Sequence, residues 1–132
     1  PKAEEQPVKT IATRAEALAS HPDNRLPITS DTLHGSLSLV GGRIDDLTLA
    51  QYRETLKKDS PEVVLLSPAK TPGAYFAEFG WLAADEATRV PGADTRWQAD
   101  AEKLAPDAPV TLRWDNGQGL AFSKQVMLDQ SY

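Results

Sequence analysis

Apolar and polar residues alternate along much of this chain, and a period of two residues predicts half-buried β-strands. The first such stretch starts at Thr32 and places Leu33, Leu37 and Leu39 on one face, opposite His34, Ser36 and Ser38. The pair Gly41-Gly42 comes next and predicts a tight turn, because glycine reaches positive φ without steric penalty. The pattern therefore predicts a strand that ends in a turn near residue 41.

A second apolar series follows the turn at Ile44, Leu47 and Leu49, and the step from 44 to 47 breaks the alternation. A β-bulge would restore the register by adding one residue to the strand. A helix beginning at Thr48 would also explain the series, with Gln51 at the capping-box position and an apolar stripe behind it. We favour the strand with a bulge.

Three later segments predict further extended structure. Residues 63–66 form a short β-branched run closed by Pro68, which predicts a buried strand. Residues 75–81 carry aromatic side chains on both faces, so a strand here is expected between two layers or beside a ligand surface. Residues 84–96 are charged and interrupted by Gly and Pro, which predicts a loop, and Trp97 is expected to anchor a short strand after it.

The clearest pattern predicts a β-hairpin over residues 110–129. Asn116-Gly117 stands between two alternating apolar segments, which is the strongest short-range hairpin signal. One apolar face carries Val110, Leu112 and Trp114, and the other strand continues it with Leu120, Phe122, Val126 and Leu128, with Lys124 in register. Regular short strands, Gly/Pro turns and no sustained helical period together predict an all-β sandwich of antiparallel strands.

Residues 1–24 are polar, include three prolines and predict a linker. Thr13 and Glu16 match a capping box, which favours one or two helical turns, and Pro22 should end them. Because the chain begins at Pro1 and has no signal-peptide pattern, we expect it to be a piece of a longer protein.

The composition fits one ordinary globular domain. The 132 residues are 40% hydrophobic and 25% charged, with a net charge of −5. The longest apolar runs have four residues, far short of the ~20 that span a bilayer. No cysteine is present, which excludes thiolate zinc sites and thiol catalysis. No Lys/Arg cluster is present, so neither a nucleic acid nor an anionic membrane surface is an expected partner.

The titratable residues give little sign of catalysis. His21 and His34 are the only histidines and match no metal-ligand or catalytic spacing. His34 is expected on the polar face of its strand as a solvated or hydrogen-bonded residue. Asp45 and Asp46 resemble a carboxylate pair, but neighbours in a strand point to opposite faces and cannot readily share one proton or one metal ion.

Three further features have ordinary structural roles as well. Glu78 inside a buried aromatic strand would suit a general acid, although an exposed, outward position is more common. Residues 115–119 lack the spaced ligands of a calcium loop and the lysine and helix of a phosphate loop, so turn chemistry accounts for them. Aromatic residues could stack on a sugar or an apolar peptide, although in a small domain they more commonly form the core. These residues are Tyr75, Phe76, Phe79, Trp81, Trp97 and Trp114. We therefore assign no catalytic, cofactor-binding or metal-binding residue.

Several short motifs, taken together, resemble one protein family. They are residues 41–47 (GGRIDDL), 52–55 (YRET), 65–68 (LLSP), 75–81 (YFAEFGW) and 112–120 (LRWDNGQGL), with Lys124 and Tyr132 after the hairpin. Over residues 25–132 the chain resembles the large periplasmic domain of YidC-type membrane protein insertases, in the form typical of alphaproteobacteria.

The resemblance implies a β-supersandwich similar to that of galactose mutarotases, with residues 25–132 as the N-terminal part of the domain. It implies a transmembrane helix before Pro1, residues 1–24 as the linker after it, and an insertase core in the membrane beyond Tyr132. The family's working groove and its arginine belong to that membrane part, so no site residue is carried over. The sandwich is expected to be incomplete, with an open sheet edge that favours self-association.

The implied function is that of a non-catalytic domain of a bacterial inner-membrane insertase and chaperone, facing the periplasm. The whole protein would insert and fold membrane proteins, alone or with the Sec translocon, so its implied partners are Sec subunits and nascent membrane proteins. The alternative is an aldose epimerase-like or carbohydrate-binding sandwich. That function needs convergent His and carboxylate groups, which two isolated histidines supply poorly. A third interpretation is a secreted adaptor whose sheet edge captures peptides.

Overall fold

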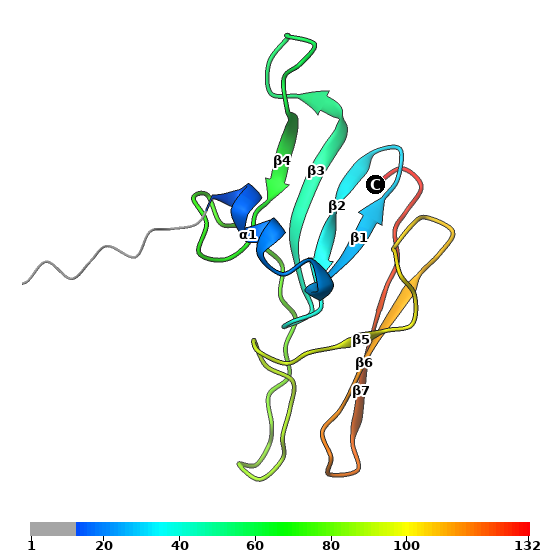
Figure 1. The fold of residues 1–132 in the computed structure, drawn as a ribbon. Coiled ribbons are helices and arrows are strands. Elements are labelled where there is room, and N and C mark those ends of the chain that lie inside the picture. Colours follow the sequence, from blue (N-terminus) through cyan, green and yellow to red (C-terminus); the bar gives the residue numbers. More distant parts are fainter. Residues whose placement is uncertain (1–12) are drawn as a thin grey trace, which may run out of the picture.

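The computed structural model describes residues 13–132, which form two antiparallel β-sheets that share one hydrophobic core (Figure 1). The larger sheet has the strand order β1-β2-β3-β4, and the smaller sheet has the order β5-β6-β7. The larger sheet consists of β1 (Arg25–Thr29), β2 (Leu33–Ser38), β3 (Arg43–Arg53) and β4 (Glu62–Leu66). The smaller sheet consists of β5 (Gln98–Ala99), β6 (Val110–Asp115) and β7 (Ala121–Val126). The prediction of an all-β sandwich is confirmed.

The core is built from inward residues of both sheets. Its fully buried members are Leu26, Ile28 and Leu37 from the larger sheet, Val110 and Leu112 from β6, and Trp97 and Leu104 from the segments around β5. Trp97 is the largest of these side chains and is 1% exposed. Its backbone N–H donates to the carbonyl oxygen of Leu39 at 2.8 Å, just beyond β2. Trp97 therefore anchors the chain as predicted, directly before β5.

Strand β1 was not predicted, because Pro27 interrupts a short apolar run. Proline is tolerated there because β1 lies at the edge of the larger sheet, where the missing N–H breaks no ladder bond. The carbonyl oxygen of Pro27 accepts a hydrogen bond from the N–H of Leu104 at 2.8 Å. The N–H of Thr29 donates to the carbonyl oxygen of Leu104 at 3.0 Å, so residue 104 covers this edge.

The predicted bulge lies at Asp45. Ser36 pairs with Asp46 and Leu37 pairs with Ile44, which leaves Asp45 as the extra residue of β3. The bulge keeps Ile44 and Leu47 on the same inward face despite their odd spacing. Strand β3 continues to Arg53, so the alternative of a helix beginning at Thr48 is wrong.

Two of the predicted strands differ in the structure. Strand β4 forms where expected, but it is an edge strand rather than a buried one, and Val64 and Leu65 are 38% and 41% exposed. Residues 75–81 form no strand and make two isolated bridges, from Tyr75 to Ser67 and from Ala77 to Ile44. Because this segment pairs first beyond the end of β4 and then with the start of β3, no continuous ladder can develop.

A short helix, α1 (Arg14–Ser20), precedes the sheets and carries the predicted capping box. The Thr13 hydroxyl accepts from the N–H of Glu16 at 3.2 Å, and the Glu16 carboxylate accepts from the N–H of Thr13 at 3.1 Å. The helix ends before Pro22, which begins the 3₁₀-helix η1 (Pro22–Asn24). Residues 1–12 of the expected linker lie outside the described residues. Within residues 13–132, none of the helices has the length and hydrophobicity that a bilayer span requires.

The predicted hairpin of β6 and β7 is confirmed, with Val110 opposite Val126 and Trp114 opposite Phe122. Gly117 lies in its loop at a φ of 73°, a conformation that favours glycine. Asn116 is buried, and its side chain joins the loop to a distant segment by donating to the carbonyl oxygen of Arg89 at 3.0 Å. The turn is therefore held by tertiary contacts as well as by its own residues.

Replacing Gly117 with Val should destabilise the domain by roughly 1 to 3 kcal/mol, because a β-branched residue is strained at this φ. A β-carbon at position 117 would meet no atom within 4 Å, so backbone strain is the expected cause. Gly92→Val is the control, since Gly92 has equal space and no positive φ. Denaturant unfolding of both variants measures the difference. Equal midpoints for Gly117→Val and the unmodified chain would contradict this account of the loop.

Candidate functional site

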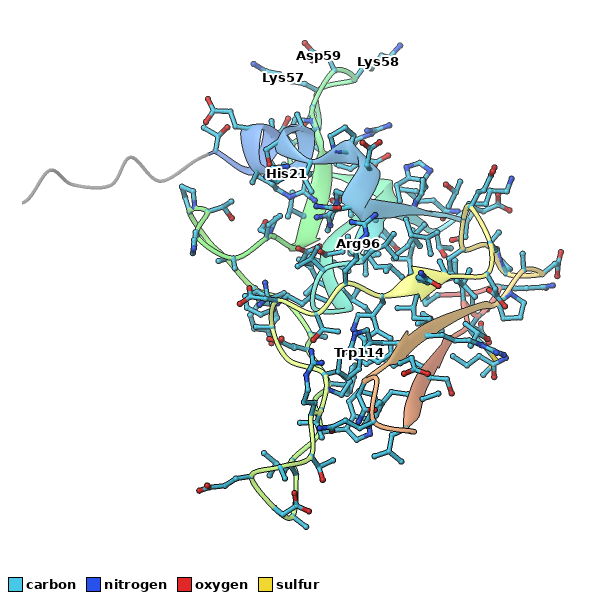
Figure 2. The ribbon with its side chains drawn as sticks, turned by 60° about the horizontal axis from the view of Figure 1, so that its bottom comes forward. His21, Lys57, Lys58, Asp59, Arg96 and Trp114 are labelled. Atoms are coloured by element: carbon cyan, nitrogen blue, oxygen red, sulfur yellow. The ribbon has the colours of Figure 1, made fainter. Side chains whose placement is uncertain are left out.

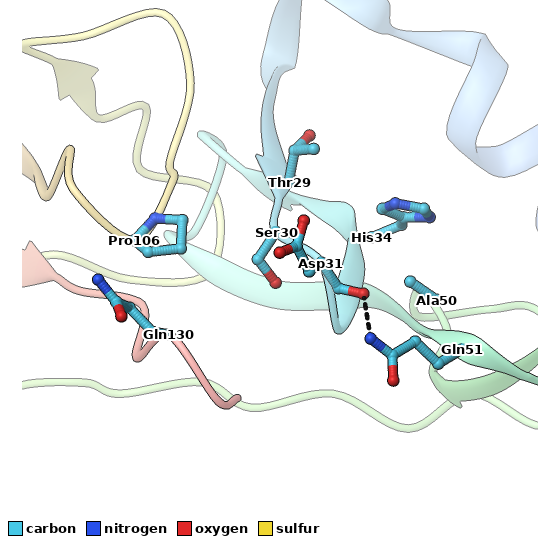
Figure 3. A pocket seen from close by; sticks show the side chains of 8 residues that line it. All are labelled: Thr29, Ser30, Asp31, His34, Ala50, Gln51, Pro106 and Gln130. Carbon is cyan, nitrogen blue, oxygen red and sulfur yellow. Dashed lines mark hydrogen bonds between the residues drawn. The ribbon is translucent and has the colours of Figure 1, made fainter.

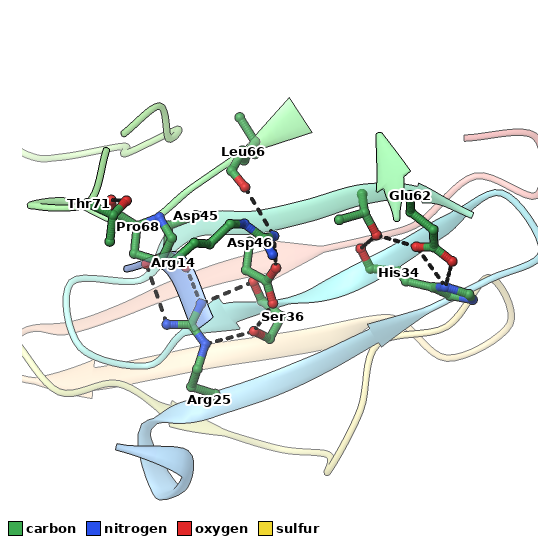
Figure 4. Close-up of polar contacts among 11 residues, drawn as sticks. Arg14, Arg25, His34, Ser36, Asp45, Asp46, Glu62, Leu66, Pro68 and Thr71 are labelled. Atoms are coloured by element: carbon green, nitrogen blue, oxygen red, sulfur yellow. Dashed lines mark hydrogen bonds and ion pairs between the residues drawn. The ribbon is translucent and has the colours of Figure 1, made fainter. Parts of the chain in front are cut away.

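The two aspartates of the bulge belong to one polar network, contrary to the prediction that they point apart (Figure 4). Arg25 forms an ion pair with Asp45, and its Nε donates to the Ser36 hydroxyl at 2.7 Å. That hydroxyl donates in turn to Asp46 at 2.7 Å. The alternation rule fails here because Asp45 is the unpaired residue of the bulge, so its side chain is not held to the opposite face.

This arginine–aspartate network, formed by Arg14, Arg25, Ser36, Asp45 and Asp46, connects elements rather than building a reactive site. Arg14 of α1 forms an ion pair with Asp46 and donates to the carbonyl oxygen of Leu66 at 3.3 Å. Each carboxylate thus faces one guanidinium, and the network reaches from α1 and β1 across to the end of β4 (Figure 4). Residues 13–132 contain no group of three or more acidic or histidine side chains placed to hold a metal ion.

His34 lies on the polar side of β2 as predicted and contacts a carboxylate (Figure 4). Its Nδ1 is 2.9 Å from an oxygen of Glu62, and the Thr48 hydroxyl donates to the same carboxylate at 2.6 Å. The bond from Thr48 lowers the pKa of Glu62 most, and His34 and Arg53 lower it further. These contacts join β2, β3 and β4 on one face. His21, by contrast, ends α1 on the surface (Figure 2).

An open polar depression of about 760 Å³ surrounds the β1–β2 turn (Figure 3). It is lined by Thr29, Ser30, Asp31, His34, Ala50, Gln51, Pro106 and Gln130. The Gln51 amide donates to the backbone carbonyl of Asp31 at 3.1 Å, while the imidazole of His34 is engaged with Glu62. The described lining contains no Phe, Tyr or Trp ring on which a sugar could stack. The depression therefore lacks the aromatic stacking surface that was considered for a sugar ligand.

The aromatic residues divide between the core and the surface. Trp97 is buried, and Trp81 and Trp114 pack against the same core. The rings of Trp81 and Trp97 lie 5.7 Å apart between centroids, and Phe122 meets Trp81 edge to face at 5.4 Å. Tyr75 and Phe79 are instead 71% and 66% exposed. The three tryptophans, of which Figure 2 labels Trp114, thus belong to the core as expected. The six aromatic residues as a whole do not.

Phe79 and Trp81 line a cavity of about 480 Å³ between β7 and the start of β3. We call it the aromatic groove. Its lining residues are Leu37, Gly42, Ile44, Phe79, Gly80, Trp81, Lys124, Gln125, Val126 and Met127. Most of these side chains are apolar, so the groove offers an apolar surface with one cation in it. Among the described residues it is the cavity that best fits the predicted stacking surface.

Lys124 is the charged residue of the aromatic groove. Its Nζ lies 5.3 Å from the ring centroid of Trp81 and 4.9 Å from that of Trp97, and it donates to the carbonyl oxygen of Phe79 at 2.8 Å. Burial lowers the pKa of Lys124, and the charge of Glu78 opposes part of that shift. The alternation of β7 placed Lys124 on the inward face, but the two tryptophans that surround it come from distant segments. No sequence pattern indicated that contact.

Glu78 is exposed, as expected, and its carboxylate takes part in an ion pair. Its Oε2 lies 3.4 Å from the Nε of Arg43, at the first residue of β3. The guanidinium of Arg43 also lies over the ring of Phe76, 5.4 Å from the centroid. The rim of the groove near Glu78 is thus held by one ion pair and one cation–π contact.

Comparison with known proteins identifies the family. The profile of the YidC periplasmic domain matches residues 25–132. The chain belongs to this family. Membrane protein insertase YidC of Roseobacter denitrificans is 50% identical over 123 residues, which is 91% of this chain and 20% of that relative. The Beijerinckia indica protein of the same name is 49% identical over 125 residues, 94% of this chain and 20% of that relative.

A third YidC, from a Ruegeria species, is 57% identical over 103 residues, 76% of this chain and 17% of that relative. The chain thus spans about a fifth of the length of these curated YidC relatives. All three sources are alphaproteobacteria, which confirms the resemblance drawn from the motifs. No solved structure matches the chain.

Replacing Asp45 with Ala should destabilise the domain by about 3 kcal/mol, because the half-buried Arg25 would lose its charge partner. Asp45 itself is only 4% exposed, so water replaces the lost carboxylate poorly. Asp94→Ala, at an exposed position with the same change of charge, is the control and should leave the free energy of unfolding nearly unchanged. Chemical denaturation measures both. If the two variants unfolded at the same midpoint, the network would not carry the stability assigned to it.

Proposed function

We propose that this chain is the N-terminal part of a non-catalytic periplasmic domain of a membrane protein insertase. The observation that carries the proposal is the family match, which runs from residue 25 to residue 132 without a gap in the described sandwich. The relatives bear the name membrane protein insertase, and the present chain corresponds to a fifth of their length. Insertion is therefore assigned to the whole protein and a binding or spacing role to this domain.

The pairing of the charged residues supports a role without chemistry. A general acid or base must reach a substrate with a proton to give or take. Here Asp45 and Asp46 each face an arginine, and Glu78 faces Arg43. None of these carboxylates shares a cavity with a free imidazole among the described residues. The geometry favours a binding or spacing domain over an epimerase-like one.

In this proposal a transmembrane helix in the bacterial inner membrane precedes the chain. Residues 1–24 are the linker after that helix, and residues 25–132 lie in the periplasm. The partners proposed for the whole protein are Sec translocon subunits and nascent membrane proteins. Support on this chain comes from the contact of Arg14 with Asp46 and Leu66, which fixes the last turns of the linker on the larger sheet. A spacing role needs such a fixed junction between linker and sandwich.

Strands β4 and β7 are outermost in their sheets, and no further strand of the described residues pairs with their outer edges. The edge at β4 is the more apolar, because Val64 and Leu65 are both exposed there. Unpaired backbone groups beside exposed apolar side chains favour pairing with another strand. We therefore assign self-association of the isolated chain to β4.

The isolated chain should self-associate with increasing concentration, and Leu65→Lys should weaken that association, because a charge at an edge opposes strand pairing. Sedimentation velocity over a concentration series measures the effect. Leu82→Lys is the matched control, since Leu82 is fully exposed in a loop away from the strand edges. A chain that stays monomeric at high concentration would refute the proposed edge pairing.

In the full-length protein, His34→Ala and Glu78→Ala should leave insertion of a test membrane protein nearly intact, because neither side chain carries a reaction. Asp45→Ala and Asp46→Ala should lower insertion only as far as they lower thermal stability. An enzyme would lose about 10² to 10⁴-fold in rate when its general acid or base is removed. A folded His34→Ala or Glu78→Ala protein that inserts nothing would overturn the proposal. So would sugar mutarotation by the unmodified chain that either change abolishes.

A further inference from the structure

Helix α1 is attached to the sandwich by one polar side chain. Among the described residues, every hydrogen bond and ion pair between residues 13–20 and the sheets belongs to Arg14 (Figure 4). Its guanidinium pairs with Asp46 and donates to the carbonyl oxygen of Leu66 at 3.3 Å. The remaining bonds of this segment are internal to it. No residue of α1 is buried, so little apolar contact adds to the ion pair.

The helix is too short to persist without that contact. It has seven residues, whereas isolated helices shorter than about 12 residues are marginal in water. The capping box between Thr13 and Glu16 stabilises its first turn but does not replace the missing turns. Docking of Arg14 and folding of α1 are therefore coupled, and release of the arginine leaves an extended segment.

The chain directly after α1 is held to the sandwich independently of Arg14. The N–H of Leu39 donates to the carbonyl oxygen of Asn24 at 2.7 Å, and Arg96 donates to the carbonyl oxygen of Asp23 at 3.4 Å. These bonds keep residues 23 and 24 in place when the helix leaves, so residues 13–22 are the part that can be released. Fully extended, this part spans at most about 35 Å, against about 10 Å for the length of α1.

The pair of Arg14 and Asp46 has the exposure of a reversible contact. Its side chains are 26% and 13% exposed, against 14% and 6% for the pair of Arg25 and Asp45. Salt weakens an ion pair that water reaches. When Arg14 leaves, Asp46 keeps the hydrogen bond from the Ser36 hydroxyl at 2.7 Å, and the Arg25 pair does not involve α1. Release therefore leaves the polar contacts within the sandwich in place.

We propose that α1 is a strap that Arg14 fastens to Asp46, and that release of this arginine lengthens the linker. The docked strap is a short spacer, and the released strap is longer by roughly 20 Å. This inference deepens the proposed function and rests on it where it concerns the membrane, since the linker there joins the sandwich to a transmembrane helix. The junction that fixes the spacing is then also the point at which the spacing changes.

Distances between two labels on the 132-residue chain test the strap. The chain has no cysteine, so Ala15→Cys on α1 and Ser123→Cys on β7, both at exposed positions, provide the labelling sites. Single-molecule fluorescence energy transfer at low salt should show one docked population. About 1 M NaCl should add a second population with a longer and broader distance. A chain that is released at low salt, or that stays docked at high salt, would overturn the proposal.

Variants identify the contact that fastens the strap. Arg14→Gln should raise the ratio of released to docked chains by about fivefold at low salt, the loss expected for one ion pair that water reaches. Adding Asp46→Asn should release no more, because both changes remove the same contact. Arg53→Gln is the control with the same change of charge, since Arg53 pairs with Glu62 and does not touch α1. If Arg14→Gln chains keep the docked distance, this arginine does not fasten the strap.

Hydrogen exchange separates release of the strap from unfolding of the sandwich. The amides of residues 17–20 should exchange faster in Arg14→Gln, while those of β2 and β3 keep their protection. Equally accelerated exchange in β2 and β3 would mean that the substitution unfolds the domain as a whole. That result would overturn the assignment of a separate strap.

Full-length protein in a bilayer tests the part of the inference that concerns the membrane. Energy transfer from a fluorophore at position 123 to acceptors in the lipid measures how far the sandwich stands from the bilayer, and Arg14→Gln should increase that distance. An unchanged distance would overturn the inference, and normal insertion by the same variant would leave the proposed function standing. Mutarotation by the unmodified chain would remove the proposed function whatever the labels show.

Discussion

The burial of Trp97 between the two sheets is the contact on which the rest of this domain depends. Its ring contributes to the core together with residues of β1, β2 and β6, and its backbone N–H binds the carbonyl oxygen of Leu39. Replacing a buried tryptophan by alanine typically costs about 3 to 5 kcal/mol, a large share of the stability of a small domain. The same ring forms one side of the Lys124 environment. The fold and the aromatic groove therefore have a common support.

The polar networks show how a chain of this size holds charged groups near its core. Asp45 is removed from water, which is unfavourable for a carboxylate unless its charge and hydrogen bonds are matched. Arg25 of the edge strand β1 provides that match, and the Ser36 hydroxyl of β2 in turn accepts a hydrogen bond from its Nε. Lys124 is accommodated differently, since aromatic faces and one carbonyl oxygen surround it. In the first network each carboxylate has a guanidinium partner, whereas the ammonium group of Lys124 has a carbonyl oxygen and aromatic faces as its partners.

The alternation of apolar and polar residues predicted those elements that have one face toward the core and one toward solvent. The hairpin of β6 and β7, strand β2 and the capping box of α1 all follow from residues close together in the sequence. Strand β1 was missed because Pro27 argues against a strand unless its position at an edge is known. The prediction of a strand at residues 75–81 was wrong because aromatic residues raise β propensity without supplying a pairing partner.

The contacts of the candidate site were harder to predict from the sequence than the strands were. The bulge at Asp45 was foreseen, but its effect on the two aspartates was not, because the alternation rule was applied through it. Lys124 was placed on the inward face correctly. Its meaning depends on Trp81, Trp97 and Gly42, which are brought to it only by the packing of the two sheets. Contacts between residues far apart in the chain leave no local trace in one sequence.

The docking of α1 has a mechanical consequence. The chain enters the larger sheet at its edge strand β1, yet Arg14 joins the helix to β3 through Asp46 and to the end of β4 through Leu66 (Figure 4). Tension on the segment before Thr13 is thus delivered to the interior and the far side of the sheet. The load is then shared by several strands and does not fall on β1 alone.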